Sequence, residues 1–269
     1  GVQVIDISDV DNLVATDSLG DNGSLALKVS RNVETFTIDS STYAIVTSNV
    51  DDGVQIIDIS DPENIEAKGS LVDAGSLKLD GARDVATFVI GSSTYAIVTS
   101  QNNSDTGVQV IDISDVDNLV ATDSLGDNGS LMLDDTRGVD VFTIGSSTYA
   151  IVTAWTDNGV QIIDISDPTD IVAKGSMVDT GSLMLDSTRG VDVFTIDSST
   201  YAIVAGYGDN GVQIIDISDV DNLIAVDAET DGVNGFTVLN AVGDVETFTI
   251  GSSTYAIAVS GGDNGVQII

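Results

Sequence analysis

A tandem repeat of about 52 residues runs through the whole chain and limits the folds that the sequence can adopt. The segment G-V-Q-[VI]-I-D-I-S-D begins at Gly1, Gly53, Gly107, Gly159 and Gly211, and G-V-Q-I-I begins at Gly265. A second segment, S-S-T-Y-A-I, recurs at Ser40, Ser92, Ser146, Ser198 and Ser252. The repeats occupy residues 1–52, 53–106, 107–158, 159–210 and 211–264, and residues 265–269 open a sixth. Because each repeat of this length forms one supersecondary unit, we expect a single domain of stacked units.

Each repeat is predicted to form four short β-strands. In the second copy, Val, Ile, Thr, Phe and Tyr dominate residues 84–90, 94–99, 107–113 and 119–124. Gly, Asp, Asn and Ser fill the gaps, which is typical of strands joined by tight turns. Four strands in a repeat of roughly 40–55 residues are typical of a propeller blade. We therefore expect an all-β fold, a β-propeller of five four-stranded blades.

The phase of the repeat leaves the closure of the propeller open. The fifth blade would take two strands from residues 245–250 and 254–259, and its outer strands from 1–7 and 13–18. This circular closure from N- and C-terminal strands would leave no open sheet edge. Gly265–Ile269 competes for the same third-strand position. Either one copy is displaced, or the chain is a segment of a longer array, or the spare strand completes a neighbouring molecule by strand addition. We expect closure, with strand exchange between subunits as the alternative.

The charge of the chain excludes several classes of partner. Acidic residues outnumber basic ones 43 to 8, which gives a formal net charge of −35. Such a field repels nucleic acid and anionic lipid. The chain has no Cys and no His, so disulfides, thiol nucleophiles and imidazole catalysis are excluded. No apolar run reaches the roughly 18 residues of a membrane helix, so we expect no membrane insertion in this segment.

One stretch makes the repeat resemble a known family. Arg137–Pro168 carries R-G-V-D-V-F-T-I, then Y-A-I-V, then N-G-V-Q-I-I-D-I-S-D-P. This pattern resembles the LVIVD repeat of β-propeller domains in bacterial and archaeal cell-surface proteins, and it covers the whole chain. These units are longer than the usual family repeat, mainly in the Asp/Gly-rich loop after the fourth strand. The resemblance implies a propeller and an extracellular, cell-surface location, without an agreed ligand or activity. The acidic composition is also similar to that of surface repeats from salt-adapted archaea.

The arginines share one repeat position, at the start of the innermost strand. They are Arg31, Arg83, Arg137 and Arg189, and Gly243 holds the position in the fifth unit. In a ring they would converge near one mouth of the central channel. They would form either an anion or carboxylate site built from guanidinium forks, or structural ties from each strand to a carboxylate of a neighbouring blade.

Alternating acids in the last long loop predict a candidate calcium site. Asp227, Glu229 and Asp231 alternate, and Gly232 follows at the sixth place. The front half of an EF-hand loop has this arrangement, although Val238 stands where the bidentate Glu would be. The alternative is aspartate capping of tight turns. The sequence requires no cofactor, and calcium is the one candidate.

Two further sets of residues recur at fixed places. Trp155 and Tyr207 are equivalent loop residues of adjacent repeats, where they could stack on a sugar, contact a partner protein or pack within their loops. The aspartates of I-D-I-S-D recur too regularly for a catalytic pair and are expected to make Asx-type turns.

We therefore expect a non-enzymatic extracellular structural protein, a surface coat or fibre subunit whose partners are further copies of itself or other surface proteins. The alternative is a ligand- or carbohydrate-binding adhesin module that uses the channel mouth or the blade-edge loops to bind glycans. An enzyme would need one unlike pair of carboxylates. The candidates Asp140 and Asp192 recur on adjacent repeats, so we expect no enzyme.

Overall fold

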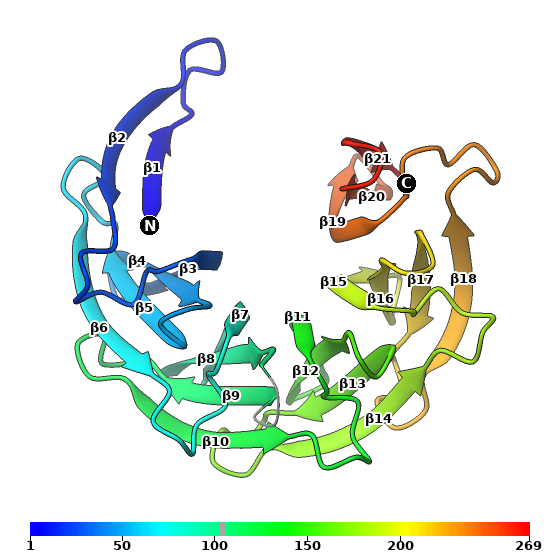
Figure 1. The fold of residues 1–269 in the computed structure, drawn as a ribbon, viewed down its shortest axis with the longest axis horizontal. Coiled ribbons are helices and arrows are strands. Elements are labelled where there is room, and N and C mark those ends of the chain that lie inside the picture. Colours follow the sequence, from blue (N-terminus) through cyan, green and yellow to red (C-terminus); the bar gives the residue numbers. More distant parts are fainter. Residues whose placement is uncertain (103–105) are drawn as a thin grey trace. The chain divides into compact units, whose positions relative to one another are not determined.

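In a computed structural model, which describes residues 1–102 and 106–269, the chain is an all-β protein (Figure 1). Its antiparallel sheets form the five blades of a β-propeller, as the repeat predicts. The chain divides into two compact units, Gly1–Ser124 and Leu125–Ile269. No helix that could cross a membrane occurs in the two described ranges.

The first unit holds a two-stranded sheet and two four-stranded blades. The two-stranded sheet consists of β1 (Val2–Asp6) and β2 (Val14–Leu19). The first blade consists of β3 (Ser30–Ile38), β4 (Ser41–Ser48), β5 (Gly53–Asp58) and β6 (Glu66–Val72). The second blade consists of β7 (Ala82–Ile90), β8 (Ser93–Ser100), β9 (Gly107–Asp112) and β10 (Val120–Gly126). Strands follow one another across each blade in chain order.

The second unit holds two four-stranded blades and a three-stranded one. The third blade consists of β11 (Thr136–Ile144), β12 (Ser147–Ala154), β13 (Gly159–Asp164) and β14 (Val172–Val178). The fourth consists of β15 (Thr188–Ile196), β16 (Ser199–Gly206), β17 (Gly211–Asp216) and β18 (Ile224–Thr230). The fifth consists of β19 (Val242–Ile250), β20 (Ser253–Ser260) and β21 (Gly265–Ile268).

The strand pairing corrects the closure that we expected for the fifth blade. The third-strand position belongs to β21, which pairs with β20 from Ser260↔Gly265 to Ile257↔Ile268. The N-terminal strands β1 and β2 instead pair with each other as a separate sheet. The physical reason is the short connection between β20 and β21, because closing a short loop costs less chain entropy than pairing strands from opposite ends of the chain.

The repeated aspartates make the turns that the sequence predicts. In each repeat the first Asp of D-I-S-D accepts a hydrogen bond from the backbone N–H of the Ser two residues later. The five carboxylates are Asp6, Asp58, Asp112, Asp164 and Asp216, with distances of 2.8–3.1 Å. The second Asp does the same one turn later, as in the 3.1 Å bond from the N–H of Asp117 to Asp115. The Asx-turn prediction is confirmed.

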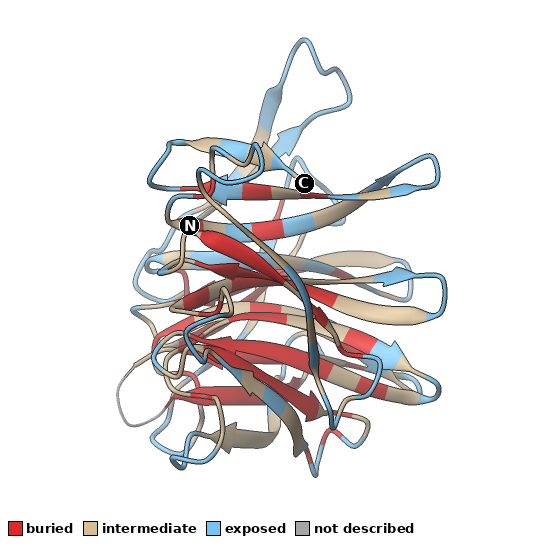
Figure 2. Ribbon diagram, turned by 90° about the vertical axis from the view of Figure 1, so that its right-hand side faces the viewer, coloured by how far each residue is buried: buried red, intermediate tan, exposed pale blue. Residues whose placement is uncertain are grey.

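The glutamine of G-V-Q ties each blade together from inside. Its side chain is buried in the four complete blades, at Gln55, Gln109, Gln161 and Gln213. The Nε2 of Gln161 donates to the carbonyls of Ile162, Lys174 and Gly175 at 2.9–3.1 Å. Its Oε1 accepts from the N–H of Met132, so one side chain links the third strand, the fourth strand and the preceding loop. Most buried residues lie on the strands, and exposed ones lie mostly on the connecting loops (Figure 2).

Candidate functional site

Four of the side chains selected from the sequence form one cluster in the second unit. The guanidinium carbon of Arg137 lies 4.9 Å from the ring centroid of Trp155, and that of Arg189 lies 4.8 Å from the same ring. Arg189 also lies 3.8 Å from the ring centroid of Tyr207. The two rings are 5.2 Å apart and tilted by 47°. We call these four residues the Arg–aromatic stack.

The stack forms because two segments of each repeat meet at the same end of the blade. Each arginine is the second residue of an innermost strand, and each aromatic residue follows directly after the second strand of the same blade. The backbone N–H of Trp155 donates to the carbonyl of Asp135, 3.0 Å away. This bond holds the turn beside the start of β11. The sequence placed both residue types at fixed positions but gave no sign that they touch.

Charge is poorly balanced within the stack. Nη2 of Arg137 forms a salt bridge of 2.6 Å with Oδ2 of Asp135. Asp135 belongs to the same repeat as Arg137, not to a neighbouring blade. The Nε of Arg189 is buried and has no hydrogen-bond partner. Burial lowers the pKa of Arg189, and the positive charge of Arg137 lowers it further, whereas Tyr207 opposes the shift. Cation–π contacts therefore carry much of the stabilisation of the Arg189 guanidinium group.

The arginines of the first unit have different surroundings. Arg83 donates from Nη1 to Oε1 of Gln101 at 2.9 Å, so a glutamine replaces the aromatic ring. Arg31 is exposed and lines a groove that is described below. The predicted meeting of all four arginines at one channel mouth joins residues of both units and stays a prediction.

Acidic side chains of the innermost strands link neighbouring blades within each unit. Oδ2 of Asp140 on β11 accepts from the N–H of Val193 on β15 at 2.8 Å. Oδ2 of Asp192 accepts from the N–H of Thr247 on β19 at 2.8 Å, and also from its hydroxyl. In the first unit, the side-chain amide of Asn32 donates to Asp84. These acids thus hold neighbouring blades of the same unit together.

Asp140 has a strongly perturbed proton affinity. Burial raises the pKa of its carboxyl group to about 7, and the nearby negative charge of Asp192 adds to the rise, against hydrogen bonds from the N–H groups of Val193 and Val141. A carboxyl group with a pKa near neutrality beside a second carboxylate has the chemistry of an acid–base pair. In the sequence the two aspartates are equivalent, because they hold the same position in adjacent repeats.

The structure does not bring the candidate calcium ligands together. Asp227 and Glu229 lie within strand β18, opposite Ile214 and Val212 of β17, and not in a loop. Both carboxylate oxygens of Glu229 accept from the amide of Asn234, and Oδ1 of Asp231 accepts from the N–H of Leu239. The described residues contain no group of three acidic side chains placed to hold a metal ion.

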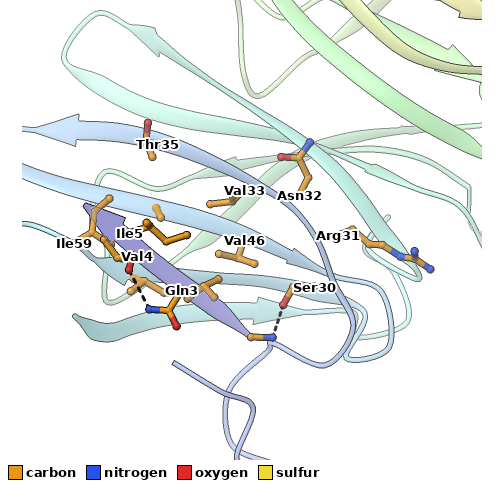
Figure 3. Close-up of a pocket in the computed structure, with 14 residues that line it drawn as sticks. Gln3, Val4, Ile5, Ser30, Arg31, Asn32, Val33, Thr35, Val46 and Ile59 are labelled. Atoms are coloured by element: carbon orange, nitrogen blue, oxygen red, sulfur yellow. Dashed lines mark hydrogen bonds between the residues drawn. The ribbon is translucent and has the colours of Figure 1, made fainter. Parts of the chain in front are cut away.

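A groove of about 480 Å³ lies in the first unit between the N-terminal sheet and the first blade (Figure 3). We call it the N-terminal groove. Its lining comes from Gly1–Ile5 of β1 and its start, from β3 and from the faces of β4 and β5, and includes Val33, Ala44, Val46, Ile57 and Ile59. In Figure 3, Ile5, Val33 and Val46 lie near one another, and Arg31 points away from them. The N-terminal ammonium donates to Ser30 Oγ at 3.1 Å and ties β1 to β3.

The groove exposes a position that is buried in the other blades. The valine two residues after the arginine position of the innermost strand is 4–8 % exposed at Val85, Val139, Val191 and Val245. The equivalent Val33 is 53 % exposed. Ile5, on the opposite side of the groove, is 50 % exposed. Within the first unit, β1 and β2 correspond to the third and fourth strands of a blade, and they leave this face of β3 exposed.

Comparison with known proteins identifies the fold. No family model and no curated protein matches the sequence, so the LVIVD resemblance stays a prediction.

Solved structures do resemble the chain. A periplasmic gluconolactonase from Pseudomonas aeruginosa is 12% identical with a TM-score of 0.62, over 86% of this chain and 63% of that one. The exo-β-1,3-galactanase of Phanerochaete chrysosporium is 9% identical with a TM-score of 0.57, over 85% of this chain and 56% of that one. A thermostable family-43 glycoside hydrolase is 13% identical with a TM-score of 0.53, over 92% and 91%. The fold is a β-propeller. The chain spans less than two thirds of the lactonase and of the galactanase.

These neighbours correct one expectation. We expected no enzyme, and the solved structures that resemble this chain include two glycoside hydrolases and a lactonase. At 9–13% identity the likeness shows the fold alone. The expectation failed because it rested on the regular recurrence of the carboxylates. Asp140 and Asp192 lie close enough for their charges to interact, and regular spacing does not exclude that.

Proposed function

We propose that the protein is an assembly module of an extracellular coat or fibre, in which a second copy of the chain fills the N-terminal groove. The exposure of Val33, against the burial of its four equivalents, is the observation that carries the proposal. Exposed aliphatic side chains that line one groove are typical of an interaction surface. The free edge of β1 adds a row of backbone groups that can pair with a further strand.

The chain itself contains the strands that can fill this groove in a second copy, namely the two inner strands of its fifth blade. Strands β19 and β20 form the first two strands of a blade that has no fourth strand. Their third strand, β21, has the sequence G-V-Q-I-I from Gly265, and β1 carries G-V-Q-V-I from Gly1. Because the two segments differ at one position, β1 of one copy can replace β21 in another copy in the same register. The acidic composition and the resemblance to surface repeats support an extracellular role.

Substitution of Val33 tests this assembly. We expect the protein to associate with rising concentration, and Val33→Asp to weaken association about 100-fold, because the interface would bury an unpaired charge. Since Val33 is already exposed, the isolated chain should keep its thermal stability. Light scattering coupled to size-exclusion chromatography measures the mass.

Val89→Asp is the matched control. Val89 is 61 % exposed on an innermost strand of the same unit, outside the groove. Its substitution should leave association unchanged. A wild-type protein that stays monomeric, or equal weakening by both substitutions, would contradict the proposal.

The buried carboxylate pair favours a second function, hydrolysis of a glycosidic bond. Asp140, which keeps a proton near neutral pH, can donate it to a leaving oxygen, while the neighbouring Asp192 carboxylate can stabilise positive charge or activate water. The likeness to a galactanase and to a family-43 hydrolase supports this chemistry. Both carboxylates also hold backbone N–H groups of the next blade, so a substrate would have to reach them at that contact.

Hydrolysis of β-1,3-galactan oligosaccharides, followed by release of reducing ends, tests the second function. We expect Asp140→Asn to lower the rate about 100-fold, because the proton donor is lost. Glu246→Gln is the control, since Glu246 is exposed at the same repeat position of the fifth blade. No hydrolysis by the wild type, or equal rates for both variants, would rule this function out for Asp140.

A further inference from the structure

The Arg–aromatic stack follows a regular order along the repeats. Each aromatic ring is contacted by the arginine of its own repeat and, where there is one, by the arginine of the next repeat. Trp155 shows the complete arrangement, with Arg137 at 4.9 Å and Arg189 at 4.8 Å from its ring centroid. This chain therefore holds two guanidinium groups against one ring, despite their mutual repulsion.

The order ends at Tyr207. Its own arginine, Arg189, lies 3.8 Å from the ring centroid. The residue that would bring the next guanidinium is Gly243, and the residue that would bring the next ring is Gly261. Both are glycines only in the fifth repeat, so the repeat symmetry breaks at the end of the stack.

The space around these two glycines is open. A Cβ atom at Gly243 would meet only Nη1 of Arg189, at 3.8 Å, and the carbonyl oxygen of Val259, at 4.0 Å. A Cβ atom at Gly261 would meet only the carbonyl oxygen of Ala241, at 3.7 Å. These are ordinary van der Waals distances. Because Gly243 and Gly261 have no side chains, neither places a group beside Tyr207 as Arg189 is placed beside Trp155.

Negative charge lies beside this place. Asp244 follows Gly243 directly and packs its carboxylate against Gly190, the neighbour of Arg189. Burial at this contact and the negative charge of Asp192 raise the pKa of the Asp244 carboxyl group. The third and fourth repeats have glycine at the position of Asp244, namely Gly138 and Gly190. An acid thus appears in the one repeat of the second unit that lacks the arginine. Within a chain of net charge −35, such a place attracts cations.

We infer that the ring of Tyr207, with Gly243, Gly261 and Asp244, forms a binding site for a guanidinium group, such as an arginine side chain of a partner protein. The ligand takes the place of the arginine that the fifth repeat lacks. Its charge is attracted by the face of the Tyr207 ring and by the Asp244 carboxylate. The inference does not depend on the proposed assembly, since none of these residues lines the N-terminal groove.

Fluorescence of the single tryptophan can test the site. Trp155 is the only tryptophan of the chain, and its ring lies 5.2 Å from that of Tyr207. We expect N-acetyl-L-argininamide to change this fluorescence in a saturable way, with a Kd of about 1–10 mM, as one exposed cation–π contact and one carboxylate allow. N-acetyl-citrullinamide has the same shape without the charge, and it should bind at least about tenfold more weakly.

Gly243→Arg should fill the site from within the chain, remove the response to argininamide and leave the protein folded. Gly20→Arg is the matched control, because Gly20 has nothing within 4 Å of an added Cβ and lies outside the second unit. Tyr207→Phe should keep binding within about twofold and Tyr207→Leu should weaken it about fivefold, which tests the ring even if Gly243→Arg does not fold. Equal binding of the two amides, an unsaturable response, or unchanged binding in Gly243→Arg or in Tyr207→Leu would overturn the inference.

Discussion

Replacing Gly159 with alanine should destabilise the protein by about 3 kcal/mol, because an added methyl group would collide with the neighbouring strand. Gly159 begins β13 and faces Val178 across the ladder to β14. A Cβ atom there would overlap the carbonyl oxygen of Met177 and lie 3.1 Å from Cα of Val178. Both are backbone atoms, so the contact cannot be relieved by a side-chain rotation. A Cβ atom at Gly1, Gly53 or Gly211, which open three other G-V-Q segments, would also collide with a backbone carbonyl oxygen of the fourth strand.

Gly265→Ala is the matched control for this prediction. Gly265 begins the same segment in β21, which has no fourth strand beside it. A Cβ atom at Gly265 would meet the side-chain Cγ1 of Val238 at 3.0 Å, and that side chain can move. We expect a loss below about 1 kcal/mol. Urea unfolding at equilibrium measures both variants, and equal losses would contradict the steric explanation.

The blades could be predicted because short sequence patterns within each repeat specify its strands and turns. The runs at 84–90, 94–99, 107–113 and 119–124 correspond to β7–β10, and the repeated Asp residues make the expected turns. The failures have physical causes. In the segment Val226–Thr230 the acids alternate with Val, Ala and Thr, which is the two-residue period of a strand, so Asp227 and Glu229 lie in β18 and not in a calcium-type loop.

The candidate sites depend on contacts between blades, which a single repeat does not encode. Arg189 touches Trp155 of the preceding repeat, 34 residues earlier in the chain, as well as Tyr207 of its own. Asp140 reaches Val193, which is 53 residues away. The alignment of the repeats nevertheless contained a usable signal. Gly243, Gly261 and Asp244 differ from the equivalent residues in the other repeats of the second unit, and all three lie at the same end of the blade. A repeat protein can form a unique site where one repeat differs from the others.

The unusual carboxyl group of Asp140 should make stability depend on pH. The ordinary pKa of 3.8 rises to about 7 in the folded protein. Between these values the folded chain keeps a proton that the unfolded chain has released, so the free energy of unfolding should fall as pH rises from about 4 to about 7. The fall attributable to this group is at most about 4 kcal/mol, and repulsion among the other acids adds to it.

The variant Asp140→Asn separates this one titration from the general repulsion. We expect the free energy of unfolding of the variant, minus that of the wild type, to rise between about pH 4 and about pH 7, and to stay constant above that range. Urea unfolding at constant ionic strength measures this difference. Asp115→Asn is the control of opposite sign, because hydrogen bonds from Asn118 and Asp117 lower the pKa of Asp115. The stabilisation by Asp115 is therefore present at higher pH and is lost only below about pH 4. Parallel pH profiles for wild type and Asp140→Asn would show that Asp140 is ionised at neutral pH, and a carboxylate that has already lost its proton could not serve as the acid of a glycoside hydrolase.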